Sequence, residues 1–294
     1  MKKTPTVAWV MLIALALVWG SSFILIKKGL LTLSAPEVGA LRIVSASVFL
    51  FPIALLRLRK VENGKLPALI AAGFLGSLIP AFLFAIAQTR MDSSITGVLN
   101  TLVPIFTILI GYFLFRQRHP WMVFLGVAIG FIGTAILITA RGGGSFSGIN
   151  AYALLVVLAT LCYAANLNLI KAKLNELPPL TVTAVSMLMV GPLATIYLFG
   201  FTDFWQKLNH VEGAGIATFY ICLLGVLGTS IALIVFNKIL QMTDALFTSS
   251  VTYIIPIVAV IWGVIDGEKI YAIQYLGMVA VGAGVYIANK YRGA

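Results

Sequence analysis

The sequence predicts an all-α membrane protein with ten transmembrane helices, arranged as a 5+5 inverted repeat. Ten apolar stretches of about 20 residues, the length that a helix needs to cross the hydrocarbon core, follow one another along the 294-residue chain. Only 10% of the residues are charged, whereas soluble domains have roughly 25%. The last five stretches repeat features of the first five. Because five is an odd number, two copies of such a unit must lie upside down to each other in the bilayer.

The expected spans are joined by short polar loops, and most of the 20 lysines and arginines lie in these loops. This placement is typical of topology signals, and it argues against a nucleic-acid surface despite the net charge of +11. The side of the membrane that holds both termini has more of these cations, so we expect both termini in the cytoplasm. The expected spans are 6–26, 37–56, 67–88, 94–115, 121–140, 150–170, 180–201, 214–236, 245–265 and 271–289.

A glycine-rich segment at 142–148 lies at the middle of the chain and is typical of a flexible linker. It predicts a first five-helix repeat at 1–141 and a second at 149–294. Several residues of the first repeat recur 152 positions later in the second, in the same order. These pairs are Phe84 with Phe236, Asp92 with Asp244, Pro104 with Pro256, and Gly111 with Gly263.

Two of the matched residues, Pro104 and Pro256, lie in the middle of expected spans. A proline inside a helix frees the backbone carbonyl four residues earlier, here at Asn100 and Thr252. A freed carbonyl within the bilayer needs a partner or a water-lined cavity. We therefore expect the prolines to act as hinges whose helices line a cavity. The alternative is a simple kink that neighbouring helices satisfy.

The chain resembles the EamA-type family of the drug/metabolite transporter superfamily over nearly its whole length. The residues that carry this resemblance include Trp19-Gly20-Ser21-Ser22-Phe23, Lys27, Pro36 and Arg42, then Ala85, Thr89, Asp92, Pro104 and Gly111, and in the second half Asn237, Asp244, Pro256, Gly263, Gly267-Glu268-Lys269, Gly277 and Gly284. The resemblance implies ten helices, a five-plus-five inverted repeat and an inner-membrane exporter of small metabolites. One departure stands out, because Gln117 in the first half takes the position of an acidic residue that the second half keeps as Glu268.

Arg42 is the one charged residue that lies well inside an expected span. Charges within the bilayer are costly and are a functional hypothesis by default. Its guanidinium suits the capture of a carboxylate or phosphate group on a substrate. The alternative is that Arg42 reaches towards the nearby interface and pairs with Glu37 or the loop.

The other candidates for substrate binding are uncharged polar and aromatic side chains in the expected spans. Amide side chains are unfavourable in contact with lipid and should point inwards. The alternative is that they form hydrogen bonds that hold helices together. The candidates are Trp19, Gln88, Asn100, Tyr163, Asn166, Asn237, Thr252 and Tyr253.

Acidic residues lie only near the ends of the spans, so the sequence shows no buried carboxylate relay of the kind that couples transport to protons. We expect facilitated export, or proton coupling through Asp92, Asp244 or Glu268. The alternative is that these acids interact with helix N-termini, which favour negative charge. Lys27 and Lys28, at the end of the first span, are expected to anchor that helix at the interface.

Together these features favour a secondary transporter that exports small organic metabolites, amino-acid-like or amphipathic, across the inner membrane by alternating access. Its partners would be a small-molecule substrate and the lipid bilayer, with possible proton coupling and no nucleic acid, metal or cofactor. An intramembrane enzyme is the first alternative, but His119 and His210 both lie in loops and no metal or catalytic motif is present. A channel or structural membrane component is the second, but the spans offer no continuous polar lining.

Overall fold

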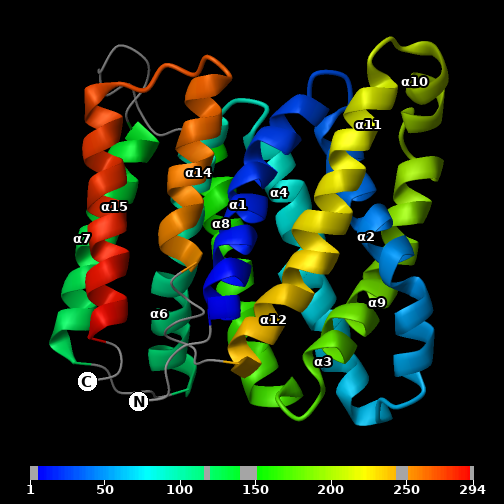
Figure 1. Cartoon of the computed structure of the whole chain (residues 1–294), viewed down its shortest axis with the longest axis horizontal. Coiled ribbons are helices and arrows are strands. Elements are labelled where there is room, and N and C mark those ends of the chain that lie inside the picture. Colours follow the sequence, from blue (N-terminus) through cyan, green and yellow to red (C-terminus); the bar gives the residue numbers. More distant parts are fainter. Residues whose placement is uncertain (1–5, 116–119, 140–150, 243–250, 292–294) are drawn as a thin grey trace.

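The structure is a computed structural model that describes residues 6–115, 120–139, 151–242 and 251–291. Within these residues every regular element is a helix, which confirms the predicted all-α class (Figure 1). The elements of the first half are α1 (Thr6–Gly29), α2 (Ala35–Leu58), η1 (Asn63–Lys65), α3 (Leu66–Gly73), η2 (Phe74–Leu78), α4 (Ile79–Ala87), α5 (Ser93–Leu99), η3 (Asn100–Leu102), α6 (Val103–Phe115) and α7 (Trp121–Thr139). Those of the second half are α8 (Ala151–Leu169), η4 (Ile170–Leu174), α9 (Pro179–Gly200), α10 (Phe204–His210), α11 (Ala214–Leu223), η5 (Leu224–Ile231), α12 (Ala232–Met242), α14 (Val251–Ile265) and α15 (Ala272–Lys290).

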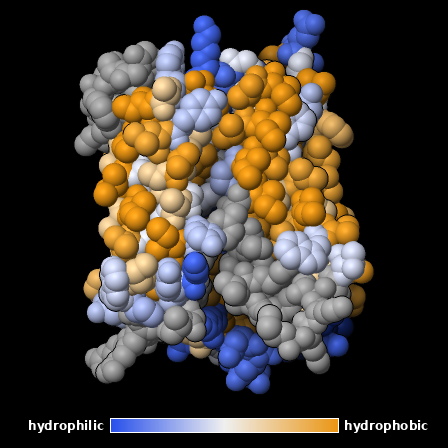
Figure 2. Space-filling model, turned by 60° about the vertical axis from the view of Figure 1, so that its left-hand side comes forward, coloured by the Kyte–Doolittle hydropathy of each residue, from blue (hydrophilic) through white to orange (hydrophobic). Residues whose placement is uncertain are grey.

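The described helices include seven that are long and apolar enough to cross a membrane. Three shorter apolar helices, Trp121–Leu137, Ile254–Ile265 and Ala272–Ala288, correspond to the other three expected spans. The linker predicted at 142–148 and the start of the span expected at 245–265 lie outside the described residues. On the face that Figure 2 shows, apolar side chains dominate a broad central band, whereas hydrophilic side chains gather towards the two ends. Such a band is the surface that a protein presents to lipid, so the chain is a multi-pass membrane protein.

The packing partners of the helices follow the symmetry that an inverted repeat requires. The second helices of the two halves, α2 and α9, pack on each other, and so do the fifth helices, α7 and α15. The first helix of each half packs on the fourth helix of the other half, α1 on α14 and α8 on α6. Each first helix also contacts the third helix of the opposite half, α1 through α11 and α12, and α8 through α4.

Glycines allow the fifth helices to approach each other closely. A Cβ atom added at Gly126, Gly133 or Gly284 would collide with backbone atoms of the facing helix, so larger residues would force α7 and α15 apart. Small residues at such positions are a common way for membrane helices to pack. Gly282 in α15 faces open space, so it takes no part in this contact.

The third helix of each half contains a widened π-helical turn, and the two turns lie at matching positions of the repeat. The first is η2 within the continuous span α3–η2–α4, and the second is η5 within α11–η5–α12. When the 152-residue offset of the sequence repeat is added to the residue numbers of η2, the resulting positions lie within η5. Turns of this kind interrupt the regular hydrogen-bond ladder and are frequent at functional sites.

The first residue of α1 and the last residue of α15 lie at the same end of the bundle, which we call the terminal end (Figure 1). Lys65 lies at this end and donates a hydrogen bond to the carbonyl oxygen of Lys173. The opposite end, where α1 ends and α2 and α5 begin, is called the far end. The positive-inside rule predicts that the terminal end faces the cytoplasm.

Candidate functional site: a cavity between the two repeats

A cavity of about 260 Å³ lies where helices of both repeats meet. This volume is close to the lower limit of ligand pockets, roughly 300–1,000 Å³. The lining is mainly apolar and aromatic, with a few polar groups, and contains no acidic side chain among the described residues. The cavity is lined by Trp19, Ser22, Phe23, Ile26, Arg42, Gly76, Phe84, Asn100, Val103, Pro104, Thr107, Tyr163, Asn166, Leu167, Gly228, Thr229, Leu233, Phe236, Val251 and Ile255.

One wall of the cavity is built around Trp19 and Arg42. The indole nitrogen of Trp19 donates a hydrogen bond of 3.0 Å to the carbonyl oxygen of Gly228, in the π-helical turn η5. The Trp19 ring lies 5.4 Å from the ring of Phe236, measured between centroids. The Nε of Arg42 donates to the hydroxyl oxygen of Thr229 at 3.1 Å. These contacts fix the indole and the guanidinium at the edge of the same cavity.

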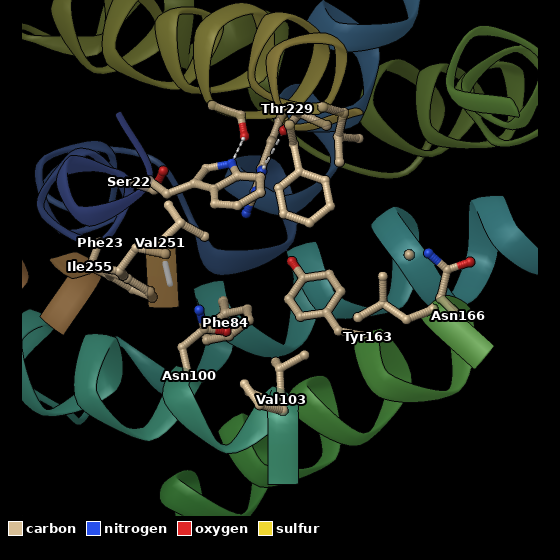
Figure 3. A pocket seen from close by; sticks show the side chains of 18 of the residues that line it. Ser22, Phe23, Phe84, Asn100, Val103, Tyr163, Asn166, Thr229, Val251 and Ile255 are labelled. Atoms are coloured by element: carbon tan, nitrogen blue, oxygen red, sulfur yellow. Dashed lines mark hydrogen bonds between the residues drawn. The ribbon is translucent and has the colours of Figure 1, made fainter. Parts of the chain in front are cut away.

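Asn100 and Tyr163 face this wall from the other side (Figure 3). The Tyr163 ring stacks on Phe84, with centroids 6.0 Å apart, and its hydroxyl points across the cavity towards the side that holds Thr229. This hydroxyl also lies close enough to Arg42 to interact with its guanidinium. Asn100 begins the 3-10 turn η3, at the point where the helix tightens just before Pro104. The polar groups of the two repeats therefore converge on one space.

Buried amide oxygens without a hydrogen-bond partner mark two sides of the cavity. They are the Oδ1 atoms of Asn100 and Asn166. Buried polar atoms are nearly always satisfied in folded proteins, so those that line a cavity are available to a ligand or to ordered water. Asn166 points towards Gly76, at a place where a Cβ atom would collide with its amide nitrogen.

Two glycines of the π-helical turns, Gly76 and Gly228, line the cavity although they were not predicted as site residues. They match under the 152-residue offset. At Gly228 the turn faces Trp19 and Ser22 of α1, and at Gly76 it faces Asn166 of α8. The repeat offset, applied to the glycines of the third helices, would have found this pair. Thr229 was missed as well, and no local signal distinguishes it from other threonines.

Among the other predicted site residues, Gln88 does not line the cavity. It is 6% exposed at the end of α4, and both polar atoms of its amide lack a partner. The side chains of Asn237, Thr252 and Tyr253 lie outside the described part of the structure, although Phe236 and Val251, next to them in sequence, line the cavity. Pro104 lines the cavity, whereas Pro256 lies within α14 beside the lining residue Ile255.

The alternative interpretation of Arg42, a pair with Glu37, is wrong. Glu37 is fully buried at the start of α2, where its carboxylate accepts hydrogen bonds from Lys207 at 2.9 Å and from the backbone N–H of Ser34 at 2.6 Å. Within the described residues, no carboxylate forms an ion pair with Arg42.

The far end carries a dense charged network. The carboxylate of Glu268, with 2% of its side chain exposed, accepts hydrogen bonds from both the backbone N–H and the hydroxyl of Ser93 and of Ser94, the first residues of α5. It also pairs with Lys27 at 2.8 Å. Asp266 pairs with Lys27 at 2.7 Å and with Lys28. The network joins the end of α1 to the start of α5 and to the loop between α14 and α15.

The pKa of Glu268 reflects these contacts. Burial alone would raise it, but the hydrogen bonds from Lys27, Ser94 and Ser93 outweigh burial and lower the pKa from 4.5 to about 2. Hydrogen bonds from Lys27 and Lys28 also lower the pKa of Asp266. The expected interaction of Glu268 with a helix N-terminus is therefore present, and Lys27 is its cationic partner.

Of the coupling candidates, the described Asp92 and Glu268 are not among the residues that line the cavity. Lys27, which holds Glu268, follows the lining residue Ile26 and lies about 12 Å along α1 from Trp19, at 1.5 Å per residue. Asp92 precedes α5 on the surface, and desolvation of its carboxyl group and then the nearby charge of Glu268 raise its pKa. Asp244 lies outside the described residues.

The fold and the cavity define a multi-pass membrane protein with a small, mostly apolar pocket that helices from both halves of the chain line together. The chain belongs to the EamA-like transporter family, whose sequence profile matches residues 6–139 and again 150–290. This double match supports the two repeats predicted from the sequence, and the family points to transport rather than to catalysis.

Similar proteins of nearly the same length agree with this assignment. The uncharacterized inner membrane transporter YedA of Escherichia coli is 25% identical over 91% of this chain and 85% of its own. A protein of Salmonella typhimurium named a probable amino-acid metabolite efflux pump is 23% identical over 92% of this chain and 90% of its own. A solved structure titled only "Crystal structure of protein" has the same fold, with a TM-score of 0.65, 17% identity and 96% coverage of both chains.

Proposed function

We propose that the protein is a secondary transporter that exports a small organic solute across the inner membrane by alternating access. The observation that carries this proposal is the position of the cavity, which polar side chains from both inverted repeats line together. A binding site at a repeat interface, reached in turn from the two sides, is the usual plan of such carriers. We further propose ten spans, with the terminal end in the cytoplasm.

Alternating access requires that contacts at one end of the bundle break while those at the other end form. The network around Glu268 holds the far end together through groups from both repeats. The π-helical turns, the 3-10 turn before Pro104 and the proline in α14 are points where helices bend at low cost. We propose that the halves rock about these points, with Pro104 and Pro256 as hinges.

The lining supports an amino-acid-like or amphipathic solute. Trp19, Phe84, Tyr163 and Phe236 offer aromatic faces, and the amides of Asn100 and Asn166 offer hydrogen bonds. The relative from Salmonella typhimurium bears a name that points to amino-acid metabolites, and the relative from Escherichia coli bears one that points to the inner membrane.

Proton coupling is best tested at Asp92. With a pKa of about 2, Glu268 keeps its charge in the physiological range, whereas the pKa of Asp92 is raised. Asp92→Asn should lose proton-linked transport if Asp92 carries the proton, and a triple variant that also neutralises Asp244 and Glu268 should lose it if any of the three does. Undiminished proton flux in proteoliposomes that contain this variant would exclude all three.

The decisive experiment is a thermal-shift screen of the purified protein against amino acids, nucleosides, sugars and amphipathic cations, because ligands stabilise the state that binds them. Asn100→Ala, Tyr163→Phe and Asn166→Ala should each weaken the response. Asn209→Ala, in the exposed helix α10, is the matched control and should leave it unchanged. A full response in all three cavity variants would show that the solute binds elsewhere.

A further inference from the structure

Among the described residues, no carboxylate compensates the positive charge that Arg42 brings to the cavity. The Nε of Arg42 is held by Thr229, a neutral group, and the Tyr163 hydroxyl, also neutral, interacts with the guanidinium. Three half-buried lysines at helix ends differ from Arg42, because Lys27, Lys28 and Lys207 each pair with a carboxylate. A guanidinium has five N–H donors, so most of its hydrogen-bonding capacity remains for a ligand.

An unpaired cation within a membrane span is expensive. An arginine within a membrane helix is costly chiefly because its charge loses contact with water. Neutral hydrogen-bond partners orient the guanidinium but do not cancel its charge. A carboxylate or other anionic group of a bound solute does both, so the cavity favours solutes that carry such a group.

The composition of the lining favours a solute whose anionic group carries a single negative charge. Arg42 is the single charged residue among the described lining residues, which matches a solute group with one negative charge. A phosphate group carries up to two charges and would retain part of its charge unpaired in this apolar space. A solute that carries a positive charge and no negative group would find no carboxylate in the described lining and would be repelled by Arg42.

The geometry around Arg42 also suits a carboxylate. Arginine binds carboxylates through two parallel hydrogen bonds, and such charge-assisted bonds are roughly twice as strong as neutral ones. The Thr229 contact occupies Nε and leaves the terminal nitrogens available. Asn100 lies on the opposite side of the cavity with its unpartnered amide oxygen, which can accept a hydrogen bond from a donor at the other end of the solute.

We propose that Arg42, positioned by Thr229, binds the carboxylate of a small monocarboxylate solute of the amino-acid type. This inference rests on the proposed transport function and names the substrate class for the same cavity. It assigns Arg42 as the specificity-determining residue that separates carboxylates from their neutral and cationic analogues.

The test is a thermal-shift titration of the detergent-purified full-length protein with the twenty standard amino acids, their carboxamides and inorganic phosphate. At least one amino acid should stabilise the wild-type protein, and its carboxamide should bind at least about tenfold more weakly, since charged hydrogen bonds contribute more than neutral ones. In Arg42→Gln the preference for the acid over the amide should vanish. Arg42→Lys should keep part of it, because it retains the charge but not the fork geometry.

Thr229→Val serves as a second variant that leaves the guanidinium in place but removes its anchor. Its acid-to-amide preference should fall between those of the wild type and Arg42→Gln, and the melting temperature of each ligand-free variant reports whether it is folded. Equal binding of acid and amide by the wild type, an unchanged preference in Arg42→Gln, or no response to any amino acid would overturn the proposal. So would a stronger response to phosphate than to every amino acid.

Failure of this inference can be separated from failure of the transporter proposal. If a neutral or cationic solute stabilises the protein and the response depends on Asn100 and Tyr163, the cavity is the binding site but Arg42 does not select a carboxylate. If no solute of any class binds, the proposed function itself fails.

Discussion

Lys27 and Arg42 are both cations within long apolar helices, but the partners of their charges differ. Lys27 lies near the end of α1, and its ammonium contacts two carboxylates, Asp266 and Glu268. Arg42 lies in α2 with a threonine hydroxyl as its hydrogen-bond partner and a cavity beside it. The first charge is neutralised within the fold, whereas the second has no carboxylate partner among the described residues, as the proposed role in binding a carboxylate requires.

This difference separates a structural charge from a functional one. A buried ion pair contributes little net stability when it forms, but the loss of one partner is strongly destabilising because the other charge is left uncompensated. An ion that the native structure already leaves without an opposite charge behaves differently, since its removal relieves a cost. The following predictions test this contrast, from the largest expected effect to the smallest.

The largest effect is expected for Glu268→Gln. The substitution removes the negative charge that holds Lys27 and the start of α5, and should lower the free energy of unfolding by about 3 kcal/mol. Equilibrium unfolding in mixed detergent and denaturant measures this loss. A variant as stable as the wild type would show that the far-end network is not structural.

Acid should reproduce part of this loss without a mutation. The pKa of Glu268 is about 2 in the folded protein and 4.5 ordinarily, so its stabilising contribution is complete above pH 4.5 and is lost as the pH falls towards 2. Thermal unfolding of the wild type should therefore become easier over this interval. In Glu268→Gln the same acidification should have a smaller effect, and parallel curves for the two proteins would contradict the assignment.

Arg42→Met should leave the stability of the ligand-free protein unchanged or raise it by up to about 1 kcal/mol. Methionine fills similar space without an uncompensated charge in an apolar span. The measurement is the same unfolding experiment without ligand. A loss comparable to that of Glu268→Gln would mean that Arg42 has a structural role like that of Lys27.

The smallest effect is expected at the terminal end, where Lys65 and Glu176 form an ion pair of 2.8 Å on the surface. The Glu176 side chain is 74% exposed, so water and salt screen the pair. Glu176→Gln should leave the unfolding transition unchanged within error. A clear loss of stability would show that the exposed ion pair at the terminal end stabilises the fold much as the buried network at the far end does.

Much of the fold could be predicted from the sequence because its main signals are local. The length of an apolar stretch and the position of a proline can be read one segment at a time, and a single repeat offset is enough to relate Pro104 to Pro256. The cavity was less predictable. Trp19, Asn100, Tyr163 and Asn166 line it as a set, but Gln88 does not, although its amide made it an equally good candidate.

By itself the sequence determined the membrane class, the order of the apolar helices and the duplicated plan, since the cost of placing polar backbone and charges in lipid acts on every segment alike. Only the tertiary structure decided which polar groups meet. Lys27 forms a hydrogen bond with Glu268, 241 positions away in the sequence, and Arg42 forms one with Thr229, 187 positions away. Such meetings depend on how each helix is rotated and packed against its neighbours, and that is a property of the assembled bundle rather than of any one segment.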